Sequence, residues 1–316
     1  MTNSSVTPPP TLEHEQPSDQ AALRTLLRGR YADGRIAALA GLSDQDLFDP
    51  ELLAALLDRS TRVRDTARWR AGRRGLDVAA VYRHVLSGST AAPAGPGAAV
   101  SALLGLAWTG TRGDLPLIEN WLADPHPRVR TAAIRALVGR TEPGEVAERV
   151  AGMLLDESSR VAVAAARVLA VASPTSTLEA EEAAWASQQV WSRRAAWHVG
   201  RARGGWHRVE ADLRAAADRN PAMAALGRAS VLNWLRSAAA TTWNQPHGAR
   251  ADRIAALLIA AQLDVDTTRL VAFHAGLPSP LESAEPRTSD VAALPDQGSG
   301  VPAPRRGWWP WSRRRR

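Results

Sequence analysis

A short helical unit recurs along this chain and constrains its possible folds more than any other feature. In residues 124–137 it reads as the end of one helix, a tight turn and a second amphipathic helix. Related stretches occupy residues 57–67 and 155–165. The anchoring valines of the three copies are Val63, Val129 and Val161. They are separated by 66 and then 32 residues, or two periods of 33 followed by one of 32, and this spacing predicts stacked helical repeats.

Weaker copies lie between and after these three. A degenerate unit occupies residues 98–107, after a Pro/Gly-rich loop at 93–97. Residues 192–197 keep the paired alanines in register, and fainter helix pairs follow at 226–235 and 253–276. The pattern therefore spans much of the chain. A single pair cannot bury its apolar face, whereas a stack of roughly seven or eight pairs shares one continuous core.

Apolar residues follow one face of each helix in the clearest copy. They are Leu117, Ile118, Trp121 and Leu122 on the first helix and Val129, Ala132, Ala133, Ala136 and Leu137 on the second. Capping residues before prolines mark helix starts. These signals are Asp49-Pro50, Asp114 before Leu115-Pro116, and Asn220-Pro221. No strand pattern of comparable quality occurs, so we expect an all-α fold.

Two copies carry an aspartate six residues before an arginine, as Asp58 with Arg64 and Asp124 with Arg130. This pattern resembles HEAT repeats of the bacterial HEAT-like class. The resemblance implies an α-solenoid of stacked antiparallel helix pairs, in which these residues form an inter-repeat polar ladder. The third copy departs from the pattern because Ala162 replaces the arginine.

Composition shifts divide the chain into four segments. We expect a disordered N-terminal tail at 1–17, the solenoid at 18–277, and a disordered linker rich in Pro, Ser, Glu and Asp at 278–304. Residues 305–316 form a Trp/Arg-rich C-terminal tail. No apolar run approaches the roughly 20 residues that span a bilayer, and the N-terminal segment has no signal-peptide core. A cytoplasmic location is expected, with peripheral contact at the inner membrane surface as an option.

The charge of the chain is concentrated at its C-terminus. The net charge is +7, with 39 basic residues against 32 acidic ones. Removing the six tail arginines leaves 33 against 32, so the remainder is nearly neutral. There is no cysteine, which excludes disulfides and thiolate-bound zinc.

The C-terminal tail combines arginines with indole rings. Its candidate contact residues are Arg305, Arg306, Trp308, Trp309, Trp311, Arg313, Arg314, Arg315 and Arg316. Tryptophan favours the headgroup boundary of a membrane and arginine is attracted to anionic lipid. The same residue types also stack on the bases and contact the phosphates of single-stranded nucleic acid, or dock on an acidic protein. We therefore expect the tail to contact an anionic surface, which is a membrane, a nucleic acid or an acidic protein.

A row of residues lies six positions after each repeat anchor, where stacking would align it along one surface. The row consists of Trp69, Arg135, Arg167 and His198, and helical spacing adds Arg194 and Arg201 beside His198. We predict that these six residues form a partner-binding groove that grips an acidic helix or a phosphate backbone. The competing interpretation is an ordinary solvated face with arginines lying over neighbouring repeats.

Twelve tryptophans are present against two phenylalanines and two tyrosines. Apolar stripes predict core packing for Trp108, Trp121, Trp185, Trp191 and Trp234. The positions of Trp69, Trp197, Trp206 and Trp243 leave their roles open.

The enzymatic alternatives among HEAT-like proteins are weaker. HEAT-like alkylpurine DNA glycosylases use tryptophan, aspartate and arginine in a DNA-facing groove, but no specific aspartate of this chain matches the catalytic one. HEAT-like di-iron hydroxylases need several His-Glu pairs, and only His14-Glu15 occurs. We therefore predict no catalytic residue, cofactor or metal. The sequence favours a non-catalytic scaffold or adaptor that binds a protein partner, with a nucleic-acid-binding protein or glycosylase-type enzyme as the alternative.

Overall fold

A computed structural model describes residues 17–88, 95–172, 177–242 and 244–278 of the chain. Within these ranges the chain forms sixteen α-helices and no strand. The first helices of the pairs are α1 (Pro17–Leu27), α3 (Asp49–Leu56), α5 (Val78–Leu86), α7 (Leu115–Asn120), α9 (Pro143–Val150), α11 (Leu178–Ala186), α13 (Gly205–Ala216) and α15 (Ala249–Ala260). The second helices are α2 (Ala32–Gly41), α4 (Thr61–Arg73), α6 (Pro96–Thr109), α8 (Pro127–Val138), α10 (Ser159–Ala172), α12 (Val190–Ala202), α14 (Pro221–Ser237) and α16 (Val265–Ala275).

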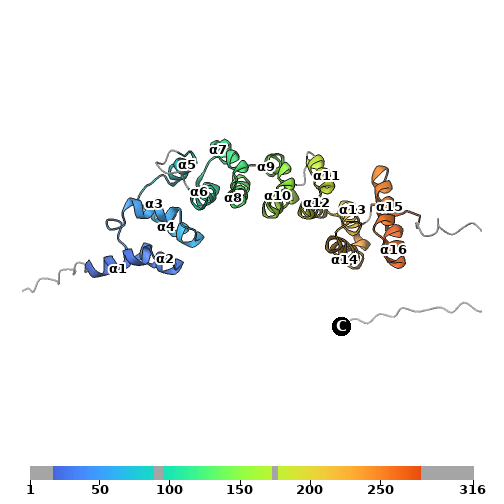
Figure 1. The fold of residues 1–316 in the computed structure, drawn as a ribbon, viewed down its shortest axis with the longest axis horizontal. Coiled ribbons are helices and arrows are strands. Elements are labelled where there is room, and N and C mark those ends of the chain that lie inside the picture. The colour runs from blue at the N-terminus through green and yellow to red at the C-terminus, as the bar shows by residue number, and fades with distance from the viewer. Residues whose placement is uncertain (1–16, 89–94, 173–176, 243, 279–316) are drawn as a thin grey trace, which may run out of the picture.

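The helix pairs stack side by side into an arch (Figure 1). The first helices lie on the outer side of the arch, and the second helices line its inner, concave side. Short 3₁₀ segments extend several first helices, as η1 (Arg112–Asp114), η2 (Trp121–Ala123) and η3 (Ala151–Leu155), and η5 (Ala239–Thr241) follows α14. The predicted all-α solenoid of antiparallel pairs is confirmed. The predicted tails and linker, at 1–17, 278–304 and 305–316, lie outside the described residues except for Pro17, which begins α1, and Pro278.

The core lies between the two helix layers and continues from repeat to repeat. One cluster of buried residues runs from Leu39 to Val199, and a second runs from Trp206 to Ala275. Small side chains allow close helix approach, and Ala133 and Ala136 are fully buried. At Gly227 of α14, an added Cβ would overlap the backbone nitrogen of Ala216. The backbones of α13 and α14 are therefore in direct contact.

The helix-start signals have different outcomes. Asn220 is the N-cap of α14, where its side chain accepts a hydrogen bond from the Met223 N–H at 3.1 Å. Asp114 precedes α7 without capping it. Its carboxylate instead accepts hydrogen bonds from the Arg83 guanidinium, at 2.6 and 3.2 Å, and from the Thr111 N–H. Residue type alone did not reveal this tertiary partner.

The predicted core role of Trp108 is wrong, because this side chain is 75% exposed at the end of α6. Almost every residue of α6 is apolar or small, so its sequence gives no clear direction to the buried face. Trp234 is buried as predicted, and Trp121, Trp185 and Trp191 are half-buried. Among the open positions, Trp197 and Trp206 are buried and Trp69 is exposed. Trp243 lies outside the described residues.

A polar ladder connects successive repeats through their inter-helix turns. Each rung pairs an arginine of one second helix with the turn aspartate of the next repeat. The rungs are Arg35–Asp58, Arg130–Asp156 and Arg193–Asp218, with N–O distances between 2.6 and 2.9 Å. Each of these arginines also donates to a carbonyl six residues upstream, as Arg64 does to the Asp58 carbonyl. The rung is missing where Ala162 and Ser187 replace its arginine and aspartate.

Candidate functional site: a basic concave face

Charge is unevenly distributed between the two helix layers from α7 to α14, where the first helices carry all the acidic helix residues and only three arginines, Arg149, Arg208 and Arg214. The second helices α8, α10, α12 and α14 contain ten arginines and no Asp or Glu. The first helices α7, α9, α11 and α13 carry Glu119, Glu145, Glu148, Glu179, Glu181, Glu182, Glu210 and Asp212. We call the exposed surface of α8, α10, α12 and α14 the basic face. Of the ten arginines, Arg130 and Arg193 are buried in the polar ladder and Arg201 pairs with Asp212, so seven exposed arginines give the basic face its positive charge.

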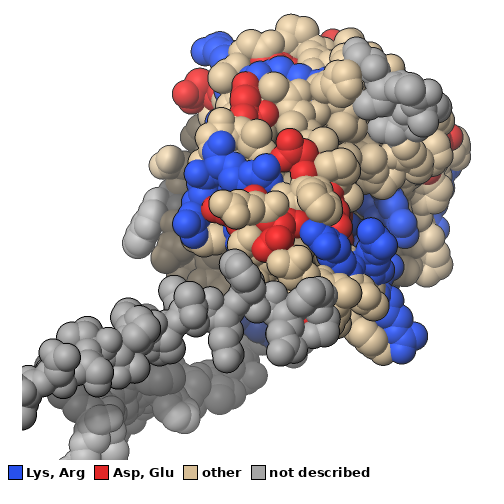
Figure 2. Space-filling view, turned by 90° about the vertical axis from the view of Figure 1, so that its left-hand side faces the viewer, with Lys and Arg blue, Asp and Glu red and all other residues tan. Residues whose placement is uncertain are grey.

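The α1 end of the arch is different. Figure 2 looks onto this end and shows acidic and basic side chains intermixed on it. Ion pairs among α1 to α4 include Arg24–Glu51, at 3.8 Å, and Arg62–Asp33, at 2.7 Å. At this end, acidic side chains pair with the arginines, whereas the second helices that form the basic face carry no acidic residue beside their exposed arginines.

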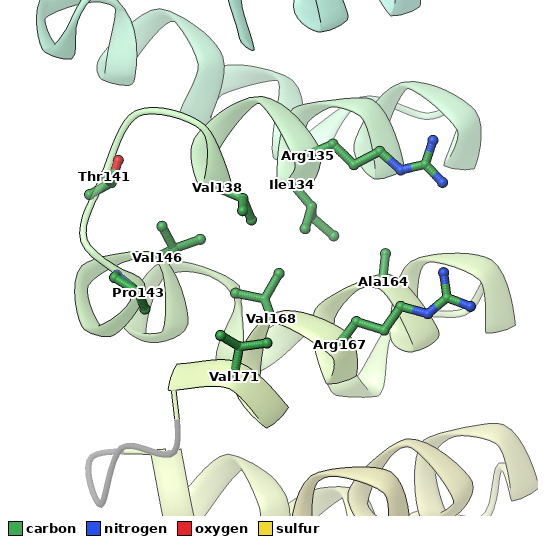
Figure 3. Close-up of a pocket in the computed structure, with 10 residues that line it drawn as sticks. All are labelled: Ile134, Arg135, Val138, Thr141, Pro143, Val146, Ala164, Arg167, Val168 and Val171. Atoms are coloured by element: carbon green, nitrogen blue, oxygen red, sulfur yellow. The ribbon is translucent and has the colours of Figure 1, made fainter. Parts of the chain in front are cut away.

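Two of the predicted groove residues, Arg135 and Arg167, lie at the mouth of an open cavity between α8 and α10. Its volume is about 290 Å³. The lining residues are Ile134, Arg135, Val138, Thr141, Pro143, Val146, Ala164, Arg167, Val168 and Val171. Figure 3 shows the aliphatic side chains around the cavity and both guanidinium groups extending on the same side of it. Within the described part of the chain neither arginine forms an ion pair.

Three further predicted residues cluster on α12. His198 is exposed, and partial desolvation together with the positive charges of Arg194, Arg201 and Arg167 lowers its pKa. The cationic surface therefore continues from α10 to α12. Arg201 is already engaged, because its guanidinium lies 4.8 Å from the centre of the Trp197 ring and 3.3 Å from a carboxylate oxygen of Asp212. Arg194 is exposed and available to a ligand.

The sixth predicted residue, Trp69, lies apart from the others. It projects from α4, is 58% exposed, and has the Arg73 guanidinium 5.1 Å from its ring centre. Helix α6 separates α4 from the basic face (Figure 1). The repeat row thus follows the second helices as the spacing predicts, but Trp69 does not line the cavity at α8 and α10.

The sequence reasoning missed the apolar part of this site. Val138 is 52% exposed and Val171 is 79% exposed. Both lie near the C-terminal ends of their helices, beyond the stripe that faces the core. The signal in the sequence is a valine just outside the buried stripe, three or four residues after Ile134 or Val168.

The structure also brings together a tryptophan, an aspartate and two arginines that the sequence could not connect. The Trp197 Nε1–H donates to Asp212 at 2.8 Å, and Arg201 and Arg208 lie 3.3 and 3.7 Å from its carboxylate. Asp212 is completely buried, and this burial raises its pKa. A carboxylate enclosed in this way has no contact with a nucleotide on the surface. Among the described residues, no group of three or more His, Asp or Glu side chains is arranged to hold a metal ion.

Comparison with known families adds one match. Residues 115–139, which cover α7, η2 and α8, match the HEAT repeat. A search of curated proteins finds no match to the chain. The matched unit, and the stack of similar helix pairs around it, support the predicted HEAT-like repeat protein.

Proposed function

Because the chain is a HEAT-like repeat protein, we propose that it is a non-catalytic scaffold or adaptor whose basic face binds an acidic partner protein. The observation that carries this proposal is the charge of the basic face, where the four central second helices expose seven arginines and carry no acid. HEAT repeats generally mediate protein interactions, and solenoids use their extended concave surfaces for binding. A surface of one sign also accelerates encounter with an oppositely charged partner.

The C-terminal tail, residues 305–316, is proposed as a second contact with an anionic surface. Its three tryptophans and six arginines suit a membrane interface with anionic lipid, at about 1 kcal/mol per basic residue. With the disordered linker that the sequence predicts at 278–304, this tail would have a typical reach of roughly 30 Å. Holding one protein on the basic face and a membrane with the tail would raise the effective concentration of the complex there. None of the helices in the described part of the chain has the length and apolarity needed to traverse a bilayer.

A charge-reversal variant tests the role of the basic face. Arg135→Glu, Arg167→Glu and Arg194→Glu together should abolish capture of the partner from native cells, while the helical circular-dichroism spectrum stays unchanged. The control reverses three exposed arginines elsewhere, Arg59, Arg112 and Arg219, and should capture the partner normally. Equal capture by the groove variant and the wild type would remove the basic face from the proposal.

Nucleic acid is the second candidate ligand, since a face with arginines and no acids also suits a phosphate backbone. This candidate, which includes a glycosylase-type enzyme, requires that the solenoid itself carries the site. Binding to duplex or single-stranded DNA would then survive removal of residues 305–316 and fall steeply with salt. Vesicle binding that is lost with the tail, without DNA binding by the remainder, would favour the scaffold.

A further inference from the structure

The cavity between α8 and α10 allows the kind of partner to be specified. We infer that this cavity binds an acidic peptide segment of the partner protein, an inference that rests on the function proposed above. One aliphatic side chain of the peptide would enter the cavity, and Arg135 and Arg167 would bind the carboxylates beside it.

The cavity is apolar, open and small. Val138 and Val171 are 52% and 79% exposed at its rim, although valine is a residue type that proteins usually bury. Its volume of about 290 Å³ lies at the lower limit for small-molecule pockets and is roughly twice that of an engineered apolar cavity that holds benzene. This space suits one large side chain, or two small ones, from a docking protein.

The lining favours an aliphatic side chain over a nucleic-acid base. Proteins that bind single strands place aromatic rings against the bases. Of the residues that the structure describes, no aromatic one lines this cavity, and its walls are formed by Ile134, Val146, Val168 and other aliphatic residues. A base inserted here would gain no stacking partner, whereas a leucine or isoleucine would bury apolar surface against side chains of its own kind.

The charge at the rim specifies the rest of the ligand. Arg135 and Arg167 occupy equivalent positions, 32 residues apart, on adjacent second helices and extend on the same side of the cavity (Figure 3). No carboxylate in the described residues pairs with either of them. Planar guanidinium groups bind carboxylates through two parallel hydrogen bonds, so two free arginines beside an apolar cavity complement glutamates or aspartates flanking an aliphatic anchor.

A designed probe peptide tests this site with the full-length protein. The probe is a fluorescent 15-residue peptide that presents one leucine between pairs of glutamates, and its binding is followed by fluorescence anisotropy at low and moderate salt. Two control peptides replace the leucine by serine or the glutamates by glutamine. Removing the leucine should weaken binding by about tenfold or more, because a buried leucine contributes about 1.5–3 kcal/mol.

Matched protein variants locate the binding. Arg135→Glu/Arg167→Glu should weaken binding by at least about tenfold, whereas Arg236→Glu/Arg269→Glu, which reverses two exposed arginines of α14 and α16, should have a much smaller effect. Val171→Asp should also weaken binding, because it places a carboxylate in the path of the apolar anchor. The side chain of Val171 is mostly exposed, so the substitution leaves the helical core intact, and thermal unfolding checks this.

The outcomes separate the cavity from the basic face as a whole. If both double variants lost the same affinity for the peptide, and replacing the peptide's leucine had no effect, the cavity site would be overturned. The proposed binding of an acidic partner by the basic face would still hold. Failure of the wild type to bind any acidic peptide would overturn both. Preferential binding of an oligonucleotide of matched charge would assign the face to nucleic acid. A self-association that Val171→Asp abolishes in analytical ultracentrifugation would assign the cavity to a second copy of the chain.

Discussion

Asp212 and Asp218 lie six residues apart, yet their surroundings affect their ionisation in opposite ways. Burial raises the pKa of Asp212, and this effect exceeds the opposite effects of the Trp197 hydrogen bond and of the positive charges of Arg201 and Arg208. Burial alone would also raise the pKa of Asp218, but hydrogen bonds from the Arg193 guanidinium and the Asn220 N–H hold it below its ordinary value. The bidentate rung therefore stabilises the charged form of Asp218, whereas the interior of α13 penalises the charged form of Asp212.

Replacing Asp218 by asparagine should destabilise the protein at neutral pH. The folded-state pKa lies below the unfolded value, so the carboxylate contributes stability that is fully present above about pH 4 and is lost as the pH falls further. Because Arg193 would keep its charge without an anionic partner, we expect a cost of about 2–4 kcal/mol at pH 7. Urea unfolding at pH 7 and near pH 3 measures this difference. A cost that is equal at the two pH values would contradict the rung.

Asp212→Asn should behave differently. The folded-state pKa of Asp212 is raised, so its ionisation opposes folding at neutral pH, and this penalty is relieved as the pH falls towards about 4. Asparagine keeps an acceptor for the Trp197 Nε1–H without a buried charge. We expect this variant to be at least as stable as the wild type at pH 7, with a relative advantage that shrinks on acidification. A large loss of stability at pH 7 would show that Arg201 and Arg208 depend on the carboxylate.

At the scale of single helices, sequence periodicity predicts which residues occupy equivalent positions in successive repeats. It predicts the buried face of a helix only where apolar and polar residues alternate around that helix. The second helices repeat every 32 or 33 residues, so the alignment of Arg135 with Arg167 follows from sequence spacing. Helix α6 is apolar on nearly all sides, and its pattern therefore could not reveal that Trp108 faces solvent. The sequence pattern could not predict the cavity between α8 and α10 either. The cavity depends on the spacing of these two helices and on valines that lie outside the apolar stripe facing the core.

Close contact between α13 and α14 gives a prediction at this scale. Gly227→Ala forces a Cβ into the backbone of Ala215 and Ala216, where overpacking costs about 1–3 kcal/mol or more. Gly72→Ala is the control, since no atom of a neighbouring element lies within 4 Å of its added Cβ and alanine favours helix by about 0.5–1 kcal/mol. Thermal unfolding should show a lower transition for the first variant and an unchanged or higher one for the second. Equal transitions would contradict the backbone contact.

At the scale of the whole molecule, net charge and charge distribution give different information. The sequence reveals a nearly neutral body, but from α7 to α14 the helix acids lie on the first helices and most of the helix arginines lie on the second, and only the stacked fold brings those arginines onto one side. The arch therefore has a cationic inner surface that composition alone does not reveal. The tail residues 305–316 add a separate cationic segment beyond the described residues.

Site-specific photocrosslinking in native cells tests the role of the concave surface most directly. A photoreactive phenylalanine derivative would replace Val138, Val171 or His198 on the second helices, and, as controls, Ala80, Glu148 or Ala183, which are exposed on the first helices. We predict that one acidic protein is crosslinked from the concave positions and not from the outer ones. Crosslinking of the same protein from the outer positions alone, or of nucleic acid from the concave ones, would contradict the account.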